Sequence, residues 1–302
     1  MNKIECTFPS TGGLCDIHAA KYLCDSPRAV LQIAHGMAEH FERYEPFIER
    51  LSAAGIAVYT NDHVGHGKSV KSEEDKGYFG EKGWQTMVDD CHALYLIAKA
   101  DYPDLPYYFF GHSMGSFVAR EYARRYGAEL SGAIFCGTGG SNPAAGAGVL
   151  VAKLIAAFKD ERHRSAFIND LAFGAYNKTF EGRTPFDWLT RDQSVVDAYI
   201  ADPDCGYLFT LNGYIGLFQA LSTVSKDDWY HGVLADLPIL LIAGAEDPVG
   251  NYGKGVAEVC DRLTETGHRK VEMKLYADCR HEILNEPEVF DTVVEDVLAF
   301  IG

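Results

Sequence analysis

A serine at a junction between a strand and a helix constrains this chain more than any other feature. Residues 111–115 read Gly-His-Ser-Met-Gly, which fits the pattern G-x-S-x-G. A continuous aromatic run precedes the pattern at 107–110, and apolar residues with helical spacing follow it at 116–126. A strand that turns directly into a helix presents its serine at a strained corner, with small residues on either side. Ser113 is therefore a candidate nucleophile, and the alternative is that it only caps the helix.

Strands and helices alternate on both sides of this corner. Before it, we predict a hairpin of strands at 4–8 and 14–24, further strands at 29–34 and 56–60, and helices at 44–54 and 83–100. After it, we predict strands at 130–136, 237–243 and 271–276, and helices at 252–264 and 286–301. Such alternation requires right-handed crossovers and predicts a mostly parallel sheet covered by helices on both faces. The expected fold class is therefore α/β.

The alternation stops from about residue 137 to residue 231, where the sequence contains no convincing strand. We therefore expect one α/β core made of residues 1–140 and 233–302, with a helical cap inserted at 141–232. Within the cap, the run 144–158 is helical in composition and almost uncharged. It could wall an acyl channel through Val151 and Leu154, rest on a lipid aggregate, or simply pack on the core.

The balance of charge narrows the classes of partner. The chain has 43 Asp and Glu against 27 Lys and Arg, a formal net charge of -16. Nucleic acids and anionic membranes bind basic surfaces, so we expect neither as a partner. No stretch approaches the roughly 18 apolar residues of a membrane span, and residues 1–16 lack the pattern of a signal peptide. A neutral or apolar small molecule is the expected substrate.

Eight cysteines are scattered along the chain without paired or regular spacing. They indicate neither a zinc site nor a disulfide framework, and a reduced cytoplasmic location is the simpler interpretation. No cluster of His, Cys and Asp has the spacing of metal ligands either. We therefore expect no metal and no cofactor.

A serine needs a neighbouring base and an orienting carboxylate to act as a nucleophile near neutral pH. In parallel sheets, reactive groups collect at the carboxyl ends of the strands. For a nucleophile at this kind of corner the chain order is serine, acid, histidine. His281, after the strand at 271–276, is the expected base. Asp247, after the strand at 237–243, is the expected acid, with Asp278 as the alternative.

Two backbone N–H groups are the expected donors to the oxyanion of the reaction. One belongs to Met114, directly after the serine, and the other to Met37, in the loop after the strand at 29–34. Because these donors are main-chain groups, the two methionine side chains are free to line an apolar pocket. We expect His35 and His40 to support the loop rather than to react.

Together these motifs resemble those of α/β-hydrolases of the monoacylglycerol lipase and lysophospholipase group, which are similar to the serine aminopeptidase S33 hydrolases. The resemblance extends over nearly the whole core and rests on the stretches 35–40, 62–69, 111–115, 244–250 and 281–286. It implies an α/β-hydrolase fold with a helical cap. It also implies a triad of Ser113, Asp247 and His281, with Met37 and Met114 as the oxyanion donors.

The resemblance further implies a cofactor-free serine ester hydrolase that acts through an acyl-enzyme on Ser113. Its expected substrates are single-chain lipid esters, either monoacylglycerols or lysophospholipids. We expect the protein to contact lipid aggregates at most transiently. A carboxylesterase of small esters and an aminopeptidase of the same fold are the alternatives. A non-catalytic binding protein is a third, which the complete set of serine, acid and histidine argues against.

Overall fold

A computed structural model describes all residues from 1 to 302. Its centre is one sheet of eight strands in the spatial order β1-β2-β4-β3-β5-β6-β7-β8. The strands are β1 (Asn2–Pro9), β2 (Asp16–Leu23), β3 (Ala29–Ala34), β4 (Ile56–Asn61), β5 (Tyr107–His112), β6 (Gly132–Cys136), β7 (Ile239–Gly244) and β8 (Val271–Tyr276). The hairpin of β1 and β2 pairs antiparallel with β4, and every pairing from β4 to β8 is parallel.

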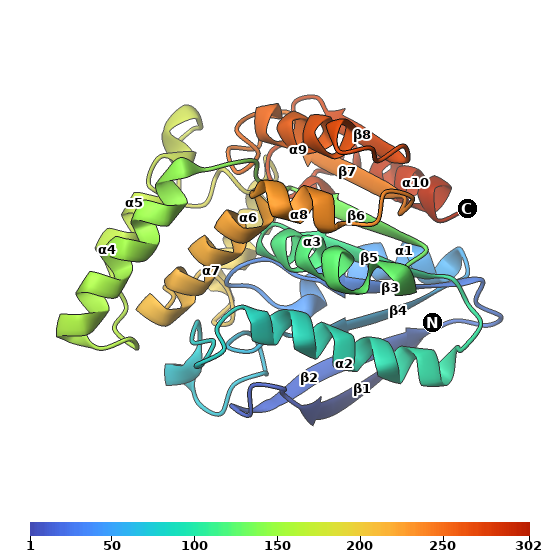
Figure 1. The fold of residues 1–302 in the computed structure, drawn as a ribbon, viewed down its shortest axis with the longest axis horizontal. Coiled ribbons are helices and arrows are strands. Elements are labelled where there is room, and N and C mark those ends of the chain that lie inside the picture. The colour runs from blue at the N-terminus through green and yellow to red at the C-terminus, as the bar shows by residue number, and fades with distance from the viewer.

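Helices cover both faces of the sheet (Figure 1). One face carries α1 (Glu45–Ala53) and α10 (Phe290–Ile301), and the other carries α2 (Gln85–Asp101), α3 (Met114–Tyr126) and α9 (Lys254–Glu265). The central strands β3 to β7 are buried along their whole length, because side chains on both of their faces contact helices. The predicted α/β fold is confirmed.

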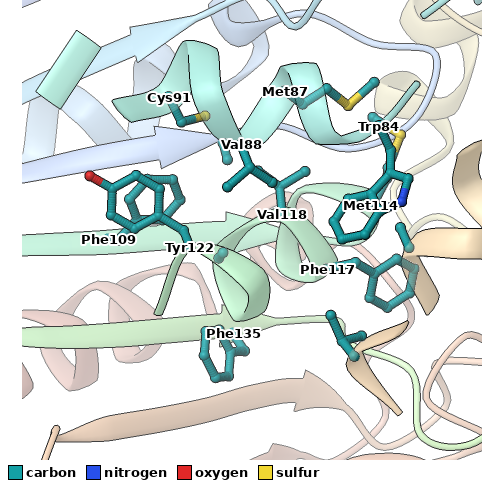
Figure 2. Packing of buried hydrophobic residues seen from close by; sticks show 14 of the residues in the cluster. Trp84, Met87, Val88, Cys91, Phe109, Met114, Phe117, Val118, Tyr122 and Phe135 are labelled. Carbon is teal, nitrogen blue, oxygen red and sulfur yellow. The ribbon is translucent and has the colours of Figure 1, made fainter. Parts of the chain in front are cut away.

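The larger of the two apolar cores fixes the helix that follows Ser113. Figure 2 shows Val88 of α2 packed toward Val118 of α3, with Met87, Trp84 and Met114 beside them. All five side chains are buried. Burying side chains of this size stabilises the fold by roughly 1.5–3 kcal/mol each. The first turn of α3 is therefore held firmly between α2 and the sheet.

Between β6 and β7 the chain contains no strand, as its composition predicted. It forms α4 (Pro143–Lys159), α5 (Ala166–Phe173), α6 (Gln193–Ala201), α7 (Leu211–Val224) and α8 (Asp227–Gly232), here called the α4–α8 segment. Helices α7 and α8 pack on α3 and share the main core, where the ring of Trp229 meets that of Phe135 edge to face. Helices α4 and α5 lie farthest from the sheet (Figure 1). None of the helices has the length and apolar character that crossing a bilayer requires.

Most of the predicted elements begin and end within two residues of the observed ones. The largest difference is the last helix, which was predicted from residue 286 and begins at Phe290. Glu286 precedes Pro287 and has ψ 103°, because the proline ring disfavours helical backbone at the residue before it.

Candidate active site

Ser113 occupies a strained corner between β5 and α3. Its backbone has φ 54° and ψ -121°, a conformation that residues with a side chain rarely adopt. A Cβ on Gly111 would overlap the carbonyl oxygen of Gly115, and a Cβ on Gly115 would overlap that of Ala34. The two glycines of the pattern are therefore required sterically. The N–H of Ser113 donates to the carbonyl oxygen of Cys136 at 3.0 Å, which fixes the corner to β6.

His281 and Asp247 lie in the loops that follow β8 and β7. Nδ1 of His281 is 2.9 Å from Oδ1 of Asp247, and the side chains are only 2% and 0% exposed. The same carboxylate oxygen accepts a hydrogen bond from the N–H of Val249 at 2.8 Å. Asp278, the alternative acid, makes no ion pair with the imidazole. The geometry thus brings the predicted base and the predicted acid together.

The loop that carries His281 is held by the α4–α8 segment. The His281 ring packs against the ring of Trp188, with centroids 5.1 Å apart. The N–H of His281 donates to the carbonyl oxygen of Trp188 at 3.4 Å, and the N–H of Glu282 donates to that of Leu189 at 2.7 Å. Arg280 donates to the carbonyl oxygen of Asp187 at 2.7 Å. The position of the imidazole therefore depends on both the α/β core and the α4–α8 segment.

A buried ion network joins this loop to the loop after β3. The Arg43 guanidinium donates to both oxygens of Glu282, at 2.9 and 2.7 Å, and also pairs with Glu39. Burial alone would raise the pKa of the Glu39 carboxyl, but the charges of Arg43 and His112 hold it well below its usual range. This network could not be predicted from the sequence, because Arg43 and Glu282 are 239 residues apart.

His112, inside the serine motif, belongs to the same network. Its Nδ1 is 2.9 Å from the hydroxyl of Tyr44, which itself donates to Glu39 at 2.8 Å. Its Nε2 is 3.3 Å from the carbonyl oxygen of His281. Burial opposes a charge on this imidazole, but the Glu39 carboxylate outweighs that effect and raises the pKa of His112. His112 thus contacts the backbone of His281 as well as the ion network.

The loop after β3 approaches the serine closely. A Cβ on Gly36 would lie 3.2 Å from Cβ of Ser113. The N–H of Gly36 donates to Oε1 of Glu39 at 2.6 Å, and its carbonyl oxygen accepts from Nδ1 of His35 at 2.8 Å. Nε2 of His35 in turn accepts from the N–H of His63 at 2.9 Å. His35 therefore supports the loop, as expected.

The backbone N–H groups of Met37 and Met114 are free and lie in the loop after β3 and at the start of α3. Neither N–H donates to another group of the protein, although Met114 begins α3 and both residues border the cavity described below. Unpaired N–H groups at a helix N-terminus and in a neighbouring loop attract a negatively charged oxygen. Both are therefore available to a ligand beside Ser113.

A cavity of about 910 Å³ opens onto Ser113 and His281. Part of its wall is apolar and comes from α3, α4 and α7: Phe117, Ala145, Gly148, Val151, Leu217 and Phe218. Val151 lies on this wall as expected, whereas Leu154 is 56% exposed and faces away from it. Helix α4 packs through buried Ala152, and Leu154 is about 200° further round the helix. This placement corrects the expectation that Leu154 lines the channel.

One group of side chains could share a metal ion, and it lies outside the lining of the cavity. It consists of His40, Asp202 and Cys205, whose ligand atoms lie within 4.8 Å of one another. Nε2 of His40 is 3.0 Å from Oδ2 of Asp202, so the pair is already an ion pair when the imidazole is protonated. His40 thus contacts the α4–α8 segment and takes no part in the arrangement around Ser113.

The fold and the geometry agree with comparisons to known proteins. Residues 25–288 match the Hydrolase_4 family, described as serine aminopeptidase, S33. The chain belongs to the S33 family. It is 30% identical over 302 residues to the monoacylglycerol lipase of Mycolicibacterium smegmatis, covering 98% of this chain and 96% of that relative. It is 28% identical over 283 residues to the monoglyceride lipase of Mus musculus, covering 92% of this chain and 83% of that relative.

A solved structure extends the agreement to three dimensions. The crystal structure of a highly thermostable carboxyl esterase from Bacillus coagulans, in complex with glycerol, superposes with a TM-score of 0.94 at 37% identity. The match covers 100% of this chain and 98% of that chain. This S33 family member is therefore a serine ester hydrolase with the α/β-hydrolase fold, of the monoacylglycerol lipase group.

Proposed function

We propose that the protein hydrolyses monoacylglycerols and similar single-chain lipid esters through an acyl-enzyme on Ser113. One observation carries the proposal: Ser113, His281 and the two residues with free N–H groups, Met37 and Met114, all line one cavity with an apolar wall. Asp247 lies outside that lining and contacts His281 at 2.9 Å. A polar reaction centre at one side of an apolar cavity suits a substrate with one ester and one alkyl chain.

In the proposed mechanism, Oγ of Ser113 attacks the ester carbon while Nε2 of His281 accepts the hydroxyl proton. The N–H groups of Met37 and Met114 stabilise the negative charge on the former carbonyl oxygen. When the intermediate collapses, His281 returns the proton to the departing alcohol. Asp247 holds the imidazole with its proton on Nδ1 and stabilises the imidazolium. A water molecule, deprotonated by the same imidazole, then releases the fatty acid.

The apolar wall supports a preference for longer acyl chains. We propose that the α4–α8 segment acts as a cap, with Val151, Leu217 and Phe218 against the alkyl chain. Each methylene buried there adds up to about 0.8 kcal/mol of binding free energy until the channel ends. The names of the Mycolicibacterium smegmatis and Mus musculus relatives, both lipases of monoglycerides, agree with this substrate class.

An exposed apolar stripe supports transient contact with lipid aggregates. On α4 it consists of Leu150, Leu154 and Phe158, four residues apart, and on α5 of Phe167 and Leu171. Large apolar side chains grouped on the outer helices of a protein favour contact with an apolar surface. We propose that this stripe, including Leu154, meets the aggregate from which the substrate is taken.

The cysteines support a proposed cytoplasmic location. All eight are free thiols in the structure, and four of them are buried. Thiols that remain unpaired are typical of reducing compartments, whereas secreted proteins tend to form disulfides.

A panel of substrates tests the proposal. It contains p-nitrophenyl esters of increasing chain length, monoacylglycerols, a lysophospholipid and an aminoacyl anilide. We expect kcat/KM to rise with chain length, and monoacylglycerols to be hydrolysed without comparable turnover of the anilide. A maximum at acetyl esters would favour a small-ester carboxylesterase, and preferential cleavage of the anilide would favour an aminopeptidase.

A further inference from the structure

Ala38 has a backbone conformation that requires support. Its φ is 50°, in the left-handed region that glycine adopts readily and that a Cβ disfavours. Residues persist in this region when surrounding contacts hold them there, and they are found most often at functional sites. Ala38 is buried and directly follows Met37, so its conformation helps to set the direction of the loop that carries the Met37 N–H.

The support comes from the α4–α8 segment. The carbonyl oxygen of Ala38 accepts two hydrogen bonds, one from the hydroxyl of Tyr199 on α6 and one from the N–H of Gly206, each at 3.0 Å. The other end of the loop is held by the core, because Gly36 is bound through His35 and Glu39. The Met37 peptide therefore lies between one anchor on the core and one on the α4–α8 segment.

The Tyr199 ring is itself held in place. It is buried, it packs edge to face with Phe186 at 5.1 Å between centroids, and the guanidinium of Arg43 lies 4.8 Å from its centroid. A ring fixed on both sides loses little further freedom when its hydroxyl donates. The hydroxyl is thus a rigid donor aimed at the Ala38 carbonyl.

We propose that Tyr199 is a positioning residue for ester hydrolysis: its hydroxyl, with the N–H of Gly206, holds Ala38 in the left-handed conformation that directs the Met37 N–H toward the oxyanion. This inference rests on the function proposed above. It gives the α4–α8 segment a part in the chemical step, in addition to walling the acyl channel. Binding of the alkyl chain and stabilisation of the transition state are then linked through the same group of helices.

The first test is the substitution Tyr199→Phe, which removes one oxygen and keeps the ring. With a short soluble ester such as p-nitrophenyl butyrate, we expect kcat to fall roughly tenfold, less than the 10²–10³-fold loss caused by removing an oxyanion donor outright. KM should change by less than about twofold, because the contact acts on the transition state. An unchanged kcat, or a higher KM at unchanged kcat, would overturn the inference.

The matched control is Tyr78→Phe. The Tyr78 hydroxyl also joins the core to the α4–α8 segment, because it donates to Glu161 at 2.6 Å, but it makes no hydrogen bond with the loop after β3. We expect its kcat and KM to equal those of the wild type. An equal fall of kcat in both variants would show that any loosening of the segment suffices and would refute a specific role for Tyr199.

A rescue separates positioning from direct contact with the substrate. Glycine adopts φ 50° without the steric cost of a Cβ, so Ala38→Gly in the Tyr199→Phe background should restore kcat roughly threefold or more. If Tyr199 bound the substrate itself, the added glycine would restore nothing, and that result would also overturn the inference. A wild-type protein without ester hydrolysis would instead refute the proposed function, so the two failures are distinguishable.

Discussion

Within the proposed triad, Nδ1 of His281 lies 2.9 Å from Oδ1 of Asp247. We expect Asp247→Asn to lower kcat by roughly 10⁴ with the fold intact, because an amide no longer holds the imidazole in the required tautomer. The measurement is kcat on a soluble ester, with circular dichroism to check folding. Asp278→Asn is the control and should leave kcat unchanged. If Asp278→Asn lost activity and Asp247→Asn kept it, the acid of the triad would be Asp278 and not Asp247.

Two buried histidines predict a loss of stability in acid. Burial lowers the pKa of His63 to about 4 and that of His66 to about 3, against about 6.5 in an unfolded chain. Below about pH 6.5 the unfolded state binds protons that the folded state excludes. The contribution of these histidines to the free energy of unfolding is therefore fully present above that pH. It is lost toward pH 4, by up to about 1.4 kcal/mol per pH unit for each histidine.

The substitution His63→Leu tests this account. Both ring nitrogens of His63 lack a hydrogen-bond partner, so an apolar side chain of similar size leaves no new polar group unpaired. Urea unfolding of the variant between pH 7 and pH 5 should show a smaller loss of unfolding free energy than the wild type shows. Equal losses in the two proteins would place the acid sensitivity elsewhere.

Single residues of the site differed in how far the sequence could predict them. Ser113, Asp247 and His281 were named because each follows a recognisable strand in the order expected for this kind of corner. The hydrogen bond from Tyr199 to Ala38 could not be predicted, because it joins residues 161 positions apart. Such a contact depends on how the α4–α8 segment folds back on the core.

At the scale of elements, α4 offers a pair of residues with opposite surroundings. Val151 lines the cavity and Leu154 lies on the outer surface. We expect Val151→Asp to lower kcat/KM for long-chain esters more than for butyrate, because a charge beside the alkyl chain is costly to bury. Leu154→Asp should leave soluble esters unaffected and slow only the hydrolysis of aggregated substrate. Equal effects of Val151→Asp on all chain lengths would argue against an acyl wall.

The orientation of α4 was not predictable from its own sequence. Apolar residues occupy nearly all positions from 144 to 158, so periodicity does not identify the buried side. Packing against α7 selects the face with Ala145, Gly148 and Ala152, where small side chains let the two helices approach. By contrast, β3 and β8 have the predicted bounds, because turn residues or charged residues flank each apolar run.

At the scale of the whole molecule, the alternation of strands and helices was enough to predict the sheet and the inserted helical stretch. It could not predict that the insertion holds both loops beside Ser113, through Trp188 and Leu189 on one side and Tyr199 and Gly206 on the other. These contacts join parts of the chain that are separate in sequence, and only tertiary packing brings them together.

The whole mechanism uses protein groups and water, so we expect hydrolysis to be insensitive to metal chelators. The possible ligand group of His40, Asp202 and Cys205 lies away from the cavity lining. The measurement is the initial rate before and after dialysis against EDTA. An aliquot dialysed against the same buffer without EDTA is the control for loss of protein. Inhibition by EDTA that zinc reverses would require a metal in the mechanism.

The central claim is an acyl-enzyme on Ser113, and labelling with a fluorophosphonate tests it most directly. Mass spectrometry should locate one adduct on the peptide that contains Ser113, with monoacylglycerol hydrolysis lost in proportion to labelling. The substitution Ser113→Ala should abolish the adduct and lower kcat by roughly 10⁶. An adduct on another residue, or full hydrolysis of monoacylglycerol by Ser113→Ala, would contradict the account.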